Sequence, residues 1–251
     1  MKQAIRGLLA RLGYRIEGIR FTPRHLFDAQ AVRHLEFDDV VCRHVFEHGA
    51  NCTFLQIGAY DGISTDPLRK FIERFGWRGV MLEPQPGPAR QLRELYPEGS
   101  GVEILEAALD CERRMRSLFT IDSDTVPTWV GSMASFDRAQ IIKHEALVPG
   151  IAEMIQEIQV TCVTMGDALD RLGSDRLDIL QIDAEGADGY LLSLFPFDRI
   201  RPAIIHWEVK HLSKEDQEDT LDLLCGHGYR IARSGGEDML AVLDDQAVRQ
   251  G

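Results

Sequence analysis

Short apolar runs alternate with amphipathic helical patterns from Cys52 to the end of the chain. Apolar runs bounded by turn residues predict strands, and apolar residues spaced three and four apart predict helices. The predicted strands cover residues 52–58, 79–84, 102–109, 177–183 and 202–209, and a terminal strand pair covers 229–234 and 238–244. The predicted helices cover residues 64–77, 87–97, 187–195 and 214–228.

This alternation determines the predicted fold class. Strands that are apolar almost throughout are buried on both faces, which is typical of a parallel sheet covered by helices. Right-handed crossovers then give an α/β doubly wound, mostly parallel sheet, and the last strand pair supplies an antiparallel terminal strand. Ligands of such a sheet bind outside the carboxyl ends of the strands, where the strand order reverses.

Two regions depart from the alternation. Residues 110–158 are long for a simple connection, so we predict an insertion at about 111–158. Near the start of the chain, Ile5, Leu8, Leu9 and Leu12 share one helical face. We therefore predict a helical extension over residues 1–50, followed by the main domain over 51–251. The apolar face is expected to dock on its own domain or to form a homodimer, rather than to lie on an anionic membrane.

Composition and charge narrow the class of protein. The formal net charge of -12 opposes binding to a nucleic-acid backbone. The five cysteines show no C-x-x-C spacing, which argues against a zinc ribbon or a secreted disulfide framework. Basic residues interrupt the first apolar stretch, which is therefore not a signal peptide, and no apolar run is long enough for a transmembrane segment. We expect a cytoplasmic protein.

Acidic residues follow four of the predicted strands. A single acid at a strand end is commonly a helix cap, but four strands that end in this way suggest a shared site. If the strands are parallel neighbours, the carboxylates converge at one edge of the sheet. The residues concerned are Asp61, Glu83, Asp183, Glu185 and Glu208.

The stretch "LQIGAYDGIS", Leu55 to Ser64, favours a particular kind of cofactor. Its glycines, Gly58 and Gly62, lack the G-x-G-x-x-G spacing that brings a backbone close to a pyrophosphate. Asp61 would repel a diphosphate but suits an ammonium or sulfonium group. Glu83, at the end of the second strand, is placed to accept hydrogen bonds from ribose hydroxyls. The pattern therefore favours S-adenosylmethionine over NAD.

Three blocks in this order resemble the FkbM-type methyltransferases, a branch of the class I, Rossmann-like S-adenosylmethionine-dependent fold with a seven-stranded sheet. They are the glycine turn "LQIGAYDGIS", the block "FGWRGVMLEPQP" and the block "LDILQIDAEGADGYLL". The resemblance runs from about Phe54 to Leu212.

The resemblance implies positions for the cofactor. Gly58 and Gly62 would form the turn below its methionine part, and Glu83 would bind the ribose. Ala107 and Ala108 would flank the adenine, and Asp183 would lie beside the sulfonium. The expected cofactor-binding residues are therefore Gln56, Gly58, Asp61, Gly62, Ser64, Glu83, Ala107, Ala108 and Asp183.

The chain departs from the family pattern at three positions. The family commonly has an acid where this chain has Gln56, an asparagine at Tyr60 and a lysine at Gln181. Gln56 can still bond the cofactor's amino group without a charge, and Tyr60 is expected to shape the acceptor pocket.

Methyl transfer to a hydroxyl needs alignment of the reactants and a base within hydrogen-bond reach of the acceptor. The expected catalytic residues are Asp183, His206 and Glu208, and the expected substrate contacts are Tyr60, His144, Glu185 and His211. His206 and His211 are equally consistent with structural histidines. Trp129, Met133, Phe136 and His144 in the insertion would form either a lid or a local core. A divalent metal held by Asp183, Glu208 and a histidine is an alternative that we do not favour.

The resemblance implies O-methylation of a small metabolite or a glycan sugar. The alternative is a non-catalytic relative that binds the cofactor or a glycan within a biosynthetic assembly. An NAD-dependent reductase is a third class, which the missing glycine fingerprint disfavours.

Overall fold

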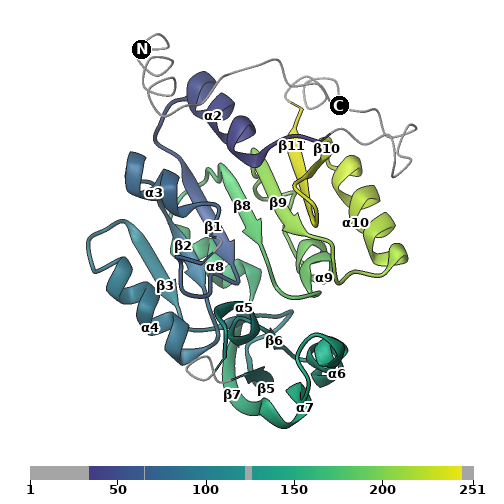
Figure 1. Ribbon diagram of the computed structural model, residues 1–251. Coiled ribbons are helices and arrows are strands. Elements are labelled where there is room, and N and C mark those ends of the chain that lie inside the picture. Colours follow the sequence, from purple (N-terminus) through teal and green to yellow (C-terminus); the bar gives the residue numbers. More distant parts are fainter. Residues whose placement is uncertain (1–33, 65, 122–125, 245–251) are drawn as a thin grey trace.

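A seven-stranded sheet forms the centre of the molecule in a computed structural model that describes residues 34–64, 66–121 and 126–244 (Figure 1). The strand order is β10-β11-β9-β8-β1-β2-β3. The strands are β1 (Thr53–Ile57), β2 (Arg78–Leu82), β3 (Val102–Leu105), β8 (Ile179–Ile182), β9 (Ile204–Glu208), β10 (Tyr229–Ser234) and β11 (Asp238–Leu243). All neighbours pair in parallel except β11, which is antiparallel to β9 and β10. The predicted fold class is confirmed.

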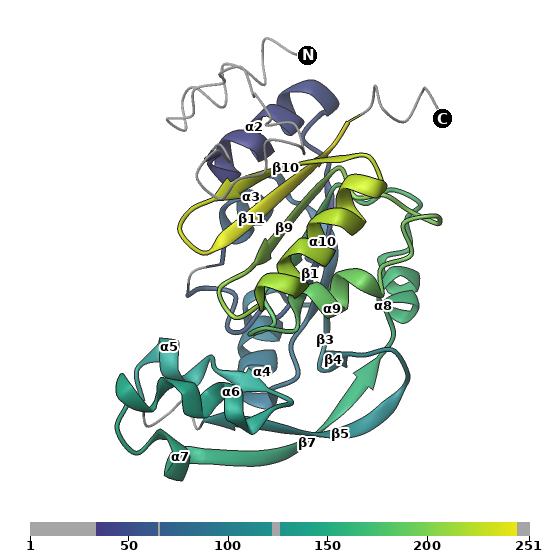
Figure 2. The ribbon, with the colours of Figure 1, turned by 90° about the vertical axis from the view of Figure 1, so that its right-hand side faces the viewer.

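Helices cover both faces of this sheet (Figure 2). One face carries α2 (Phe37–His48), α3 (Arg69–Phe75) and α4 (Pro86–Leu95), and the other carries α8 (Met165–Leu172), α9 (Asp188–Ser193) and α10 (Lys214–Gly226). Two apolar cores result, one between each helical layer and the sheet. The burial of both strand faces explains why the strand sequences are apolar almost throughout.

The strand order reverses beside β1. The chain proceeds outward from β1 through β2 to β3 and later returns to the opposite side of β1 with β8. This is the topological switch point, where the loops after β1 and β8 diverge and leave a crevice.

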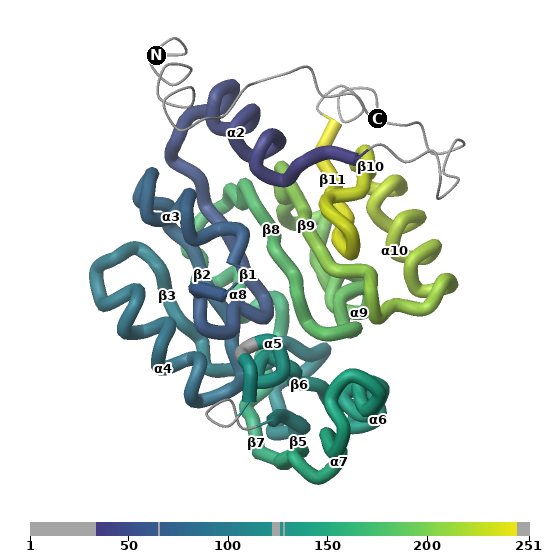
Figure 3. Tube along the Cα trace, in the orientation of Figure 1, coloured from purple at the N-terminus to yellow at the C-terminus, as the bar shows by residue number. Residues whose placement is uncertain are grey.

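A second sheet interrupts the alternation between β3 and α8 (Figure 3). Its order is β4-β7-β5-β6, and its strands are β4 (Ala108–Leu109), β5 (Arg114–Ile121), β6 (Ala134–Ser135) and β7 (Ile155–Val163). Four short helices accompany it: α5 (Thr128–Gly131), α6 (Arg138–Ile142), η3 (Lys143–Ala146) and α7 (Ile151–Met154). The sheet lies below the carboxyl ends of β1, β8 and β9 in the view of Figure 1.

The single strand predicted over residues 102–109 is wrong. β3 ends at Leu105, and after Ala107 the chain enters β4, which pairs with β7 of the second sheet. An apolar pattern cannot reveal this change of sheet, because the residues on both sides of the break are partly or fully buried.

The helix predicted over residues 64–77 is shorter in the structure. It begins at Arg69, because the Asp66 carboxylate accepts hydrogen bonds from the backbone N–H groups of Leu68 and Arg69 at 2.7 and 3.3 Å. Capping of this kind satisfies N–H groups that have no partner within the helix.

The N-terminal part is described from residue 34 onward. Phe37 of α2 packs on Phe71 of α3 and on His206 of β9, with ring centroids 6.3 and 4.6 Å apart. The amphipathic helix predicted around Leu8 lies outside the described residues. Across the described part of the chain, no helix has the length and apolar character that a membrane crossing requires.

Candidate functional site

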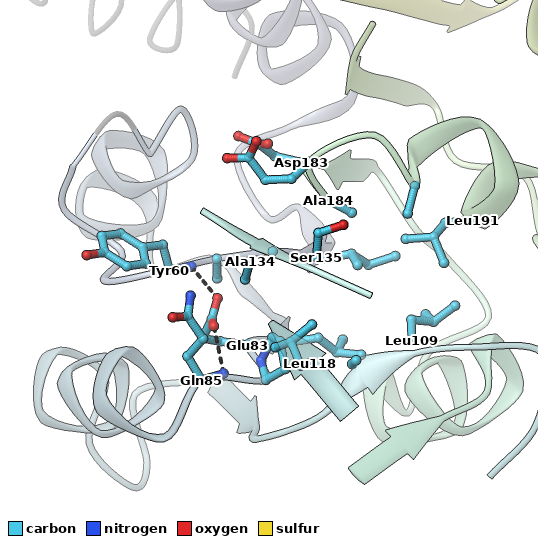
Figure 4. A pocket seen from close by; sticks show the side chains of 18 of the residues that line it. Tyr60, Glu83, Gln85, Leu109, Leu118, Ala134, Ser135, Asp183, Ala184 and Leu191 are labelled. Atoms are coloured by element: carbon cyan, nitrogen blue, oxygen red, sulfur yellow. Dashed lines mark hydrogen bonds between the residues drawn. The ribbon is translucent and has the colours of Figure 1, made fainter. Parts of the chain in front are cut away.

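A cavity of about 850 Å³ lies between the carboxyl ends of the main-sheet strands and the second sheet. Figure 4 shows side chains from both sheets around it, with Glu83 after β2, Asp183 after β8, and Leu118 and Ser135 from the second sheet. Eleven residues expected from the sequence to contact a ligand line this cavity: Gln56, Gly58, Tyr60, Ser64, Glu83, Ala107, Ala108, Asp183, Glu185 and, from the expected lid, Trp129 and Phe136.

The glycine turn is fixed by the strands on either side of it. The N–H groups of Gly58 and Ala59 both donate to the Leu82 carbonyl at 3.0 and 3.1 Å. Gly58 has a φ of +76°, and a Cβ at this position would lie 1.8 Å from the Asp183 carbonyl oxygen. No side chain fits there, so the close approach of the β1 and β8 loops requires glycine.

Gly62 and Asp61 maintain the shape of the same loop. A Cβ on Gly62 would lie 2.6 Å from a methyl group of Leu92, so this glycine lets the loop pack on α4. The Asp61 carboxylate accepts hydrogen bonds from the N–H groups of Ile63 and Ser64 and from the Ser64 hydroxyl, at 2.7 to 2.8 Å. Neither Asp61 nor Gly62 lines the cavity.

Glu83 presents a buried carboxylate to the cavity, and its residue exposure is only 3%. Its two oxygens accept the Tyr60 and Gln85 N–H groups at 2.8 Å each (Figure 4). Burial raises the pKa of Glu83 to about 7, although these N–H groups act in the opposite direction. Each carboxylate oxygen can accept a further hydrogen bond, so a diol that donates to both is a suitable partner.

Gln56 and Asp66 lie at another part of the cavity lining. Gln56 is 3% exposed. Within the described residues, its Oε1 and the Asp66 Oδ2 are buried and have no hydrogen-bond partner. Sequence reasoning missed Asp66 as a site residue, because its position before a helix is fully explained by capping.

Small and apolar residues form a further wall. Ala107 and Ala108 are buried and line the cavity together with Leu109, Leu118 and Leu191. This wall offers apolar contact to a flat ring, as the family resemblance implies for Ala107 and Ala108.

Asp183 and Glu185 follow β8, and both line the cavity. Glu185 has a φ of +49°, and only Tyr60 shares a positive φ among the described non-glycine residues. Such backbone strain is concentrated at functional sites. Burial raises the pKa of Glu185 to about 7, and the Asp183 charge adds to this; burial also raises the pKa of Asp183 itself.

Glu185 also belongs to a group of three potential metal ligands. The ligand atoms of Glu185, Glu208 and His211 all lie within 4.8 Å of one another. The His211 Nε2 is 3.4 Å from a Glu185 oxygen and 3.9 Å from a Glu208 oxygen. Burial, followed by the charges of Asp183, Glu185 and Asp188, raises the pKa of Glu208 to about 9. Glu208 and His211 do not line the cavity themselves.

His206 lies in the core and not in the cavity lining. Its Nδ1 is 2.7 Å from the Gln181 Oε1, and its ring packs on Phe37. Burial lowers its pKa to about 4, so the imidazole is neutral. Gln181 does line the cavity and separates His206 from it.

The insertion contributes aromatic and polar groups. Trp129 and Phe136 line the cavity, and Met133 is buried in a small local core with Ile121 and Ile151. The Arg116 guanidinium lies 3.7 Å from the Phe136 ring centroid. His144 does not reach the cavity, but its ring contacts that of His211 with centroids 5.6 Å apart.

The family is decided by a family model described as the methyltransferase FkbM domain, which matches residues 56–231, more than half of the 251 residues. The chain belongs to the FkbM methyltransferase family. Membership implies S-adenosylmethionine as the methyl donor. A search of curated protein sequences finds no match to this FkbM-family chain.

Solved structures show distant likeness. The methyltransferase FkbM from Methylobacillus flagellatus KT has 13% identity and a TM-score of 0.49, over 77% of this chain and 44% of that chain. The present chain therefore spans less than half of that protein's length. The precorrin-6y C5,15-methyltransferase from Geobacter metallireducens GS-15 has 12% identity and a TM-score of 0.41, over 77% of this chain and 81% of that chain. The N-terminal domain of human METTL16 has 12% identity and a TM-score of 0.43, over 98% of this chain and 83% of that chain.

The cavity of this FkbM-family chain fits the methyl donor on structural grounds. Glu83 suits the ribose diol, the Ala107 and Ala108 wall suits the adenine, and the unpartnered oxygens of Gln56 and Asp66 suit a hydrogen-bond donor. The cavity volume of about 850 Å³ lies within the range of small-molecule sites and leaves room for a second ligand.

Proposed function

We propose that this chain transfers a methyl group from S-adenosylmethionine to a hydroxyl of a small metabolite or a glycan sugar. The observation that carries the proposal is the buried Glu83 carboxylate in a cavity that both sheets line. When bound, the cofactor supplies a methyl group on a positively charged sulfur, which departs as a neutral thioether.

The residues of the chain bind and orient the two reactants. Glu83 holds a ribose at the end of β2, and Asp183 lies at the end of β8, two strands away and across the switch point. Fixing an acceptor against a reactive carbon in this way contributes ~7–11 kcal/mol to lowering the barrier in well-oriented systems.

A carboxylate of the β8 loop takes the acceptor's proton. Asp183 and Glu185 both line the cavity, and the pKa of Glu185, about 7, suits a group that must be ionised near neutral pH. The bound cofactor would supply the methyl carbon for the new O–C bond and would leave as the neutral thioether, and this carboxylate would accept the proton of the hydroxyl. Glu208 and His211 lie behind Glu185 and orient it.

The second sheet, its helices and α9 line the part of the cavity that we assign to the acceptor. Trp129 and Tyr190 are 51% and 47% exposed, and both line the cavity beside Ser132, Ser135 and Gln140. Exposed aromatic rings surrounded by hydroxyl and amide groups suit a ligand with both apolar faces and several hydroxyls, such as a sugar.

Calorimetric titration tests the cofactor assignment. We expect S-adenosylmethionine to bind the wild-type protein and Glu83→Ala to weaken that binding at least about 10-fold, because hydrogen bonds to a charged group are lost. An equal affinity in Glu83→Ala, with a retained fold, contradicts the assignment.

A non-catalytic relative remains the second candidate, and the uncharged Gln56 at the end of β1 favours it. Transfer of a tritiated methyl group to cell-extract metabolites, compared between the wild type and Asp183→Ala, separates the two. If the wild type binds the cofactor but transfers no methyl group, the result supports the non-catalytic relative.

The proposal also covers the class of acceptor, the cellular location and the oligomeric state of the protein. The net charge of -12 disfavours a nucleic-acid acceptor. We propose a cytoplasmic enzyme that acts without a resident metal, and homodimer formation through the apolar face around Leu8 remains a prediction from the sequence.

A further inference from the structure

Two buried oxygen acceptors without partners lie next to each other in the cavity lining. One is the Gln56 Oε1 at the end of β1, and the other is the Asp66 Oδ2 before α3. Leaving a buried acceptor unsatisfied costs roughly 1–3 kcal/mol, and more for a charged group. Such a pair in a cavity therefore indicates where a ligand donates hydrogen bonds.

The two oxygens of Asp66 have different roles. Oδ1 accepts the Leu68 and Arg69 N–H groups and caps α3. Oδ2 faces no donor at ordinary hydrogen-bond distance within the described residues. Burial is the largest effect on the Asp66 carboxyl and raises its pKa to about 6, although the Leu68 and Arg69 N–H groups and a weaker hydrogen-bonding interaction with the Gln56 side chain act to lower it.

No basic side chain forms an ion pair with Asp66 in the described part of the chain, although Arg69 lies near enough for a weak charge interaction. None of the ion pairs among the described residues includes Asp66. Arg69, the basic residue nearest in sequence, is directed to Glu73, with the Nε 2.7 Å from the carboxylate. One oxygen of this cavity-lining carboxylate thus caps α3, and the other is buried without a hydrogen-bond partner among the described residues.

Asp66 and Gln56 belong to β1 and its loop. Of the other carboxylates that line the cavity, Glu83 follows β2, Asp183 and Glu185 follow β8, Asp110 is paired with Arg114 and Arg116, and Asp137 caps α6. Glu83 is matched by ribose hydroxyls in the proposed function, and Asp183 and Glu185 face the reacting groups. The part of the methyl donor that still lacks an anionic partner is its α-ammonium.

We propose that Asp66 binds the α-ammonium of the cofactor's methionine part through Oδ2, with the Gln56 Oε1 as a second acceptor. This inference rests on the proposed function, because it requires the methyl donor in this cavity. Asp66 then supplies the negative charge that Gln56, at the end of β1, cannot.

The test is calorimetric binding of S-adenosylhomocysteine and of its analogue in which hydrogen replaces the amino group. Neither ligand has a methyl group to transfer, so activity does not enter the measurement. We expect Asp66→Asn to weaken S-adenosylhomocysteine binding about 10- to 100-fold, as for a lost hydrogen bond between charged groups. Binding of the deaminated analogue should change less than about threefold.

Two further variants control for structure. Asparagine keeps a side-chain oxygen for the α3 cap, so thermal melting should show an intact fold. Gln56→Glu in the Asp66→Asn background places a carboxylate next to position 66. This double variant should recover most of the lost affinity for S-adenosylhomocysteine. Glu73→Gln, on the exposed side of α3, should leave the affinity for both ligands unchanged.

The outcomes separate this inference from the proposed function. If the wild type binds neither ligand, both the proposed function and the role of Asp66 are contradicted. If the wild type binds and Glu83→Ala weakens binding, but Asp66→Asn affects both ligands equally or neither, the role of Asp66 is overturned while the cofactor site stands.

Discussion

At the residue scale, the two loops after β1 and β8 determine the site. Gly58 touches the backbone of Asp183, and the two described non-glycine residues with positive φ, Tyr60 and Glu185, follow in these same loops. A left-handed conformation costs an L-residue roughly 1–2 kcal/mol. The strained positions therefore mark the edge where the cofactor and acceptor candidates converge.

Gly58→Ala should destabilise the protein by about 3 kcal/mol or prevent folding, since the added Cβ combines overpacking with an unfavourable φ. The matched control is Gly87→Ala in α4, where a Cβ would meet nothing within 4 Å. Urea denaturation should place the control near the wild type. A Gly58→Ala midpoint equal to that of the control would contradict the close approach to Asp183.

The pH dependence of kcat tests the base in the β8 loop. A base works when deprotonated, so kcat should rise with pH through about 7, the pKa of Glu185, and level off above it. Measuring kcat with both substrates saturating removes the contribution of Glu83 to cofactor binding. Glu185→Gln should lower kcat about 100-fold and flatten the profile near pH 7. A Glu185→Gln profile that keeps the inflection assigns the base to Asp183 instead.

At the scale of elements, Asp110 joins the second sheet to α9. It lies between β4 and β5, and its carboxylate accepts hydrogen bonds from Arg114, Arg116 and the Tyr190 hydroxyl, at 2.8 to 3.2 Å. Burial opposes ionisation, but the hydrogen bonds from Arg114, the Cys111 N–H and Arg116 outweigh it and hold the pKa of Asp110 well below its usual range.

Asp110→Asn should lower the unfolding free energy by roughly 1.5–3 kcal/mol at pH 7, as for a hydrogen bond to a charged group. Because the folded-state pKa is depressed, this stabilisation is present above the unfolded pKa of about 4 and is lost as the pH falls through the folded value. The variant should therefore lose less of its Tm than the wild type between pH 5 and pH 3. Glu112→Gln, which removes an exposed partner of Arg114, is the control and should resemble the wild type.

Sequence patterns predicted the main sheet because burial on both faces leaves a signature in each strand. They did not predict the second sheet, since β5 and β7 pair antiparallel across more than 30 residues and both have exposed positions. The α3 start was misplaced because the pattern does not show which residue provides the capping oxygen.

The candidate site was predictable where a motif and a strand end coincide, as at Gly58, Glu83 and Asp183. His206 shares a strand with Glu208, but only the tertiary packing of Phe37 and Gln181 shows that it is enclosed in the core. Asp66 was not predictable as a ligand-binding residue, because its free oxygen becomes visible only once burial and hydrogen bonds are known.

At the scale of the whole molecule, both sheets contribute residues to the cavity. In the proposed function, Gln56, Glu83 and Asp183 of the main sheet and Ala108 of β4 bind the cofactor, and the segment with α5 and β6 provides Trp129 and Phe136 for the acceptor. The proposed acceptor contacts Trp129 and Phe136 therefore lie in one continuous segment, apart from the strands that carry the proposed cofactor contacts.

Trp129→Ala tests this division. Trp129 is half-exposed, so its loss should leave the fold and the affinity for S-adenosylhomocysteine unchanged. The KM for the acceptor should rise about 10-fold, since an aromatic contact surface is removed from the cavity. An equal loss of cofactor affinity would show that the two sides are not separate.

The position of the second sheet below the strand ends also has a kinetic consequence. Glu83 is almost completely enclosed, whereas Trp129 and Tyr190 of the same cavity lining remain half-exposed. A ligand seated at Glu83 has to enter before an acceptor occupies the space next to these rings. Turnover should then follow a compulsory order, with the cofactor first on and its thioether product last off, and an unreactive deoxy acceptor should inhibit uncompetitively against the cofactor.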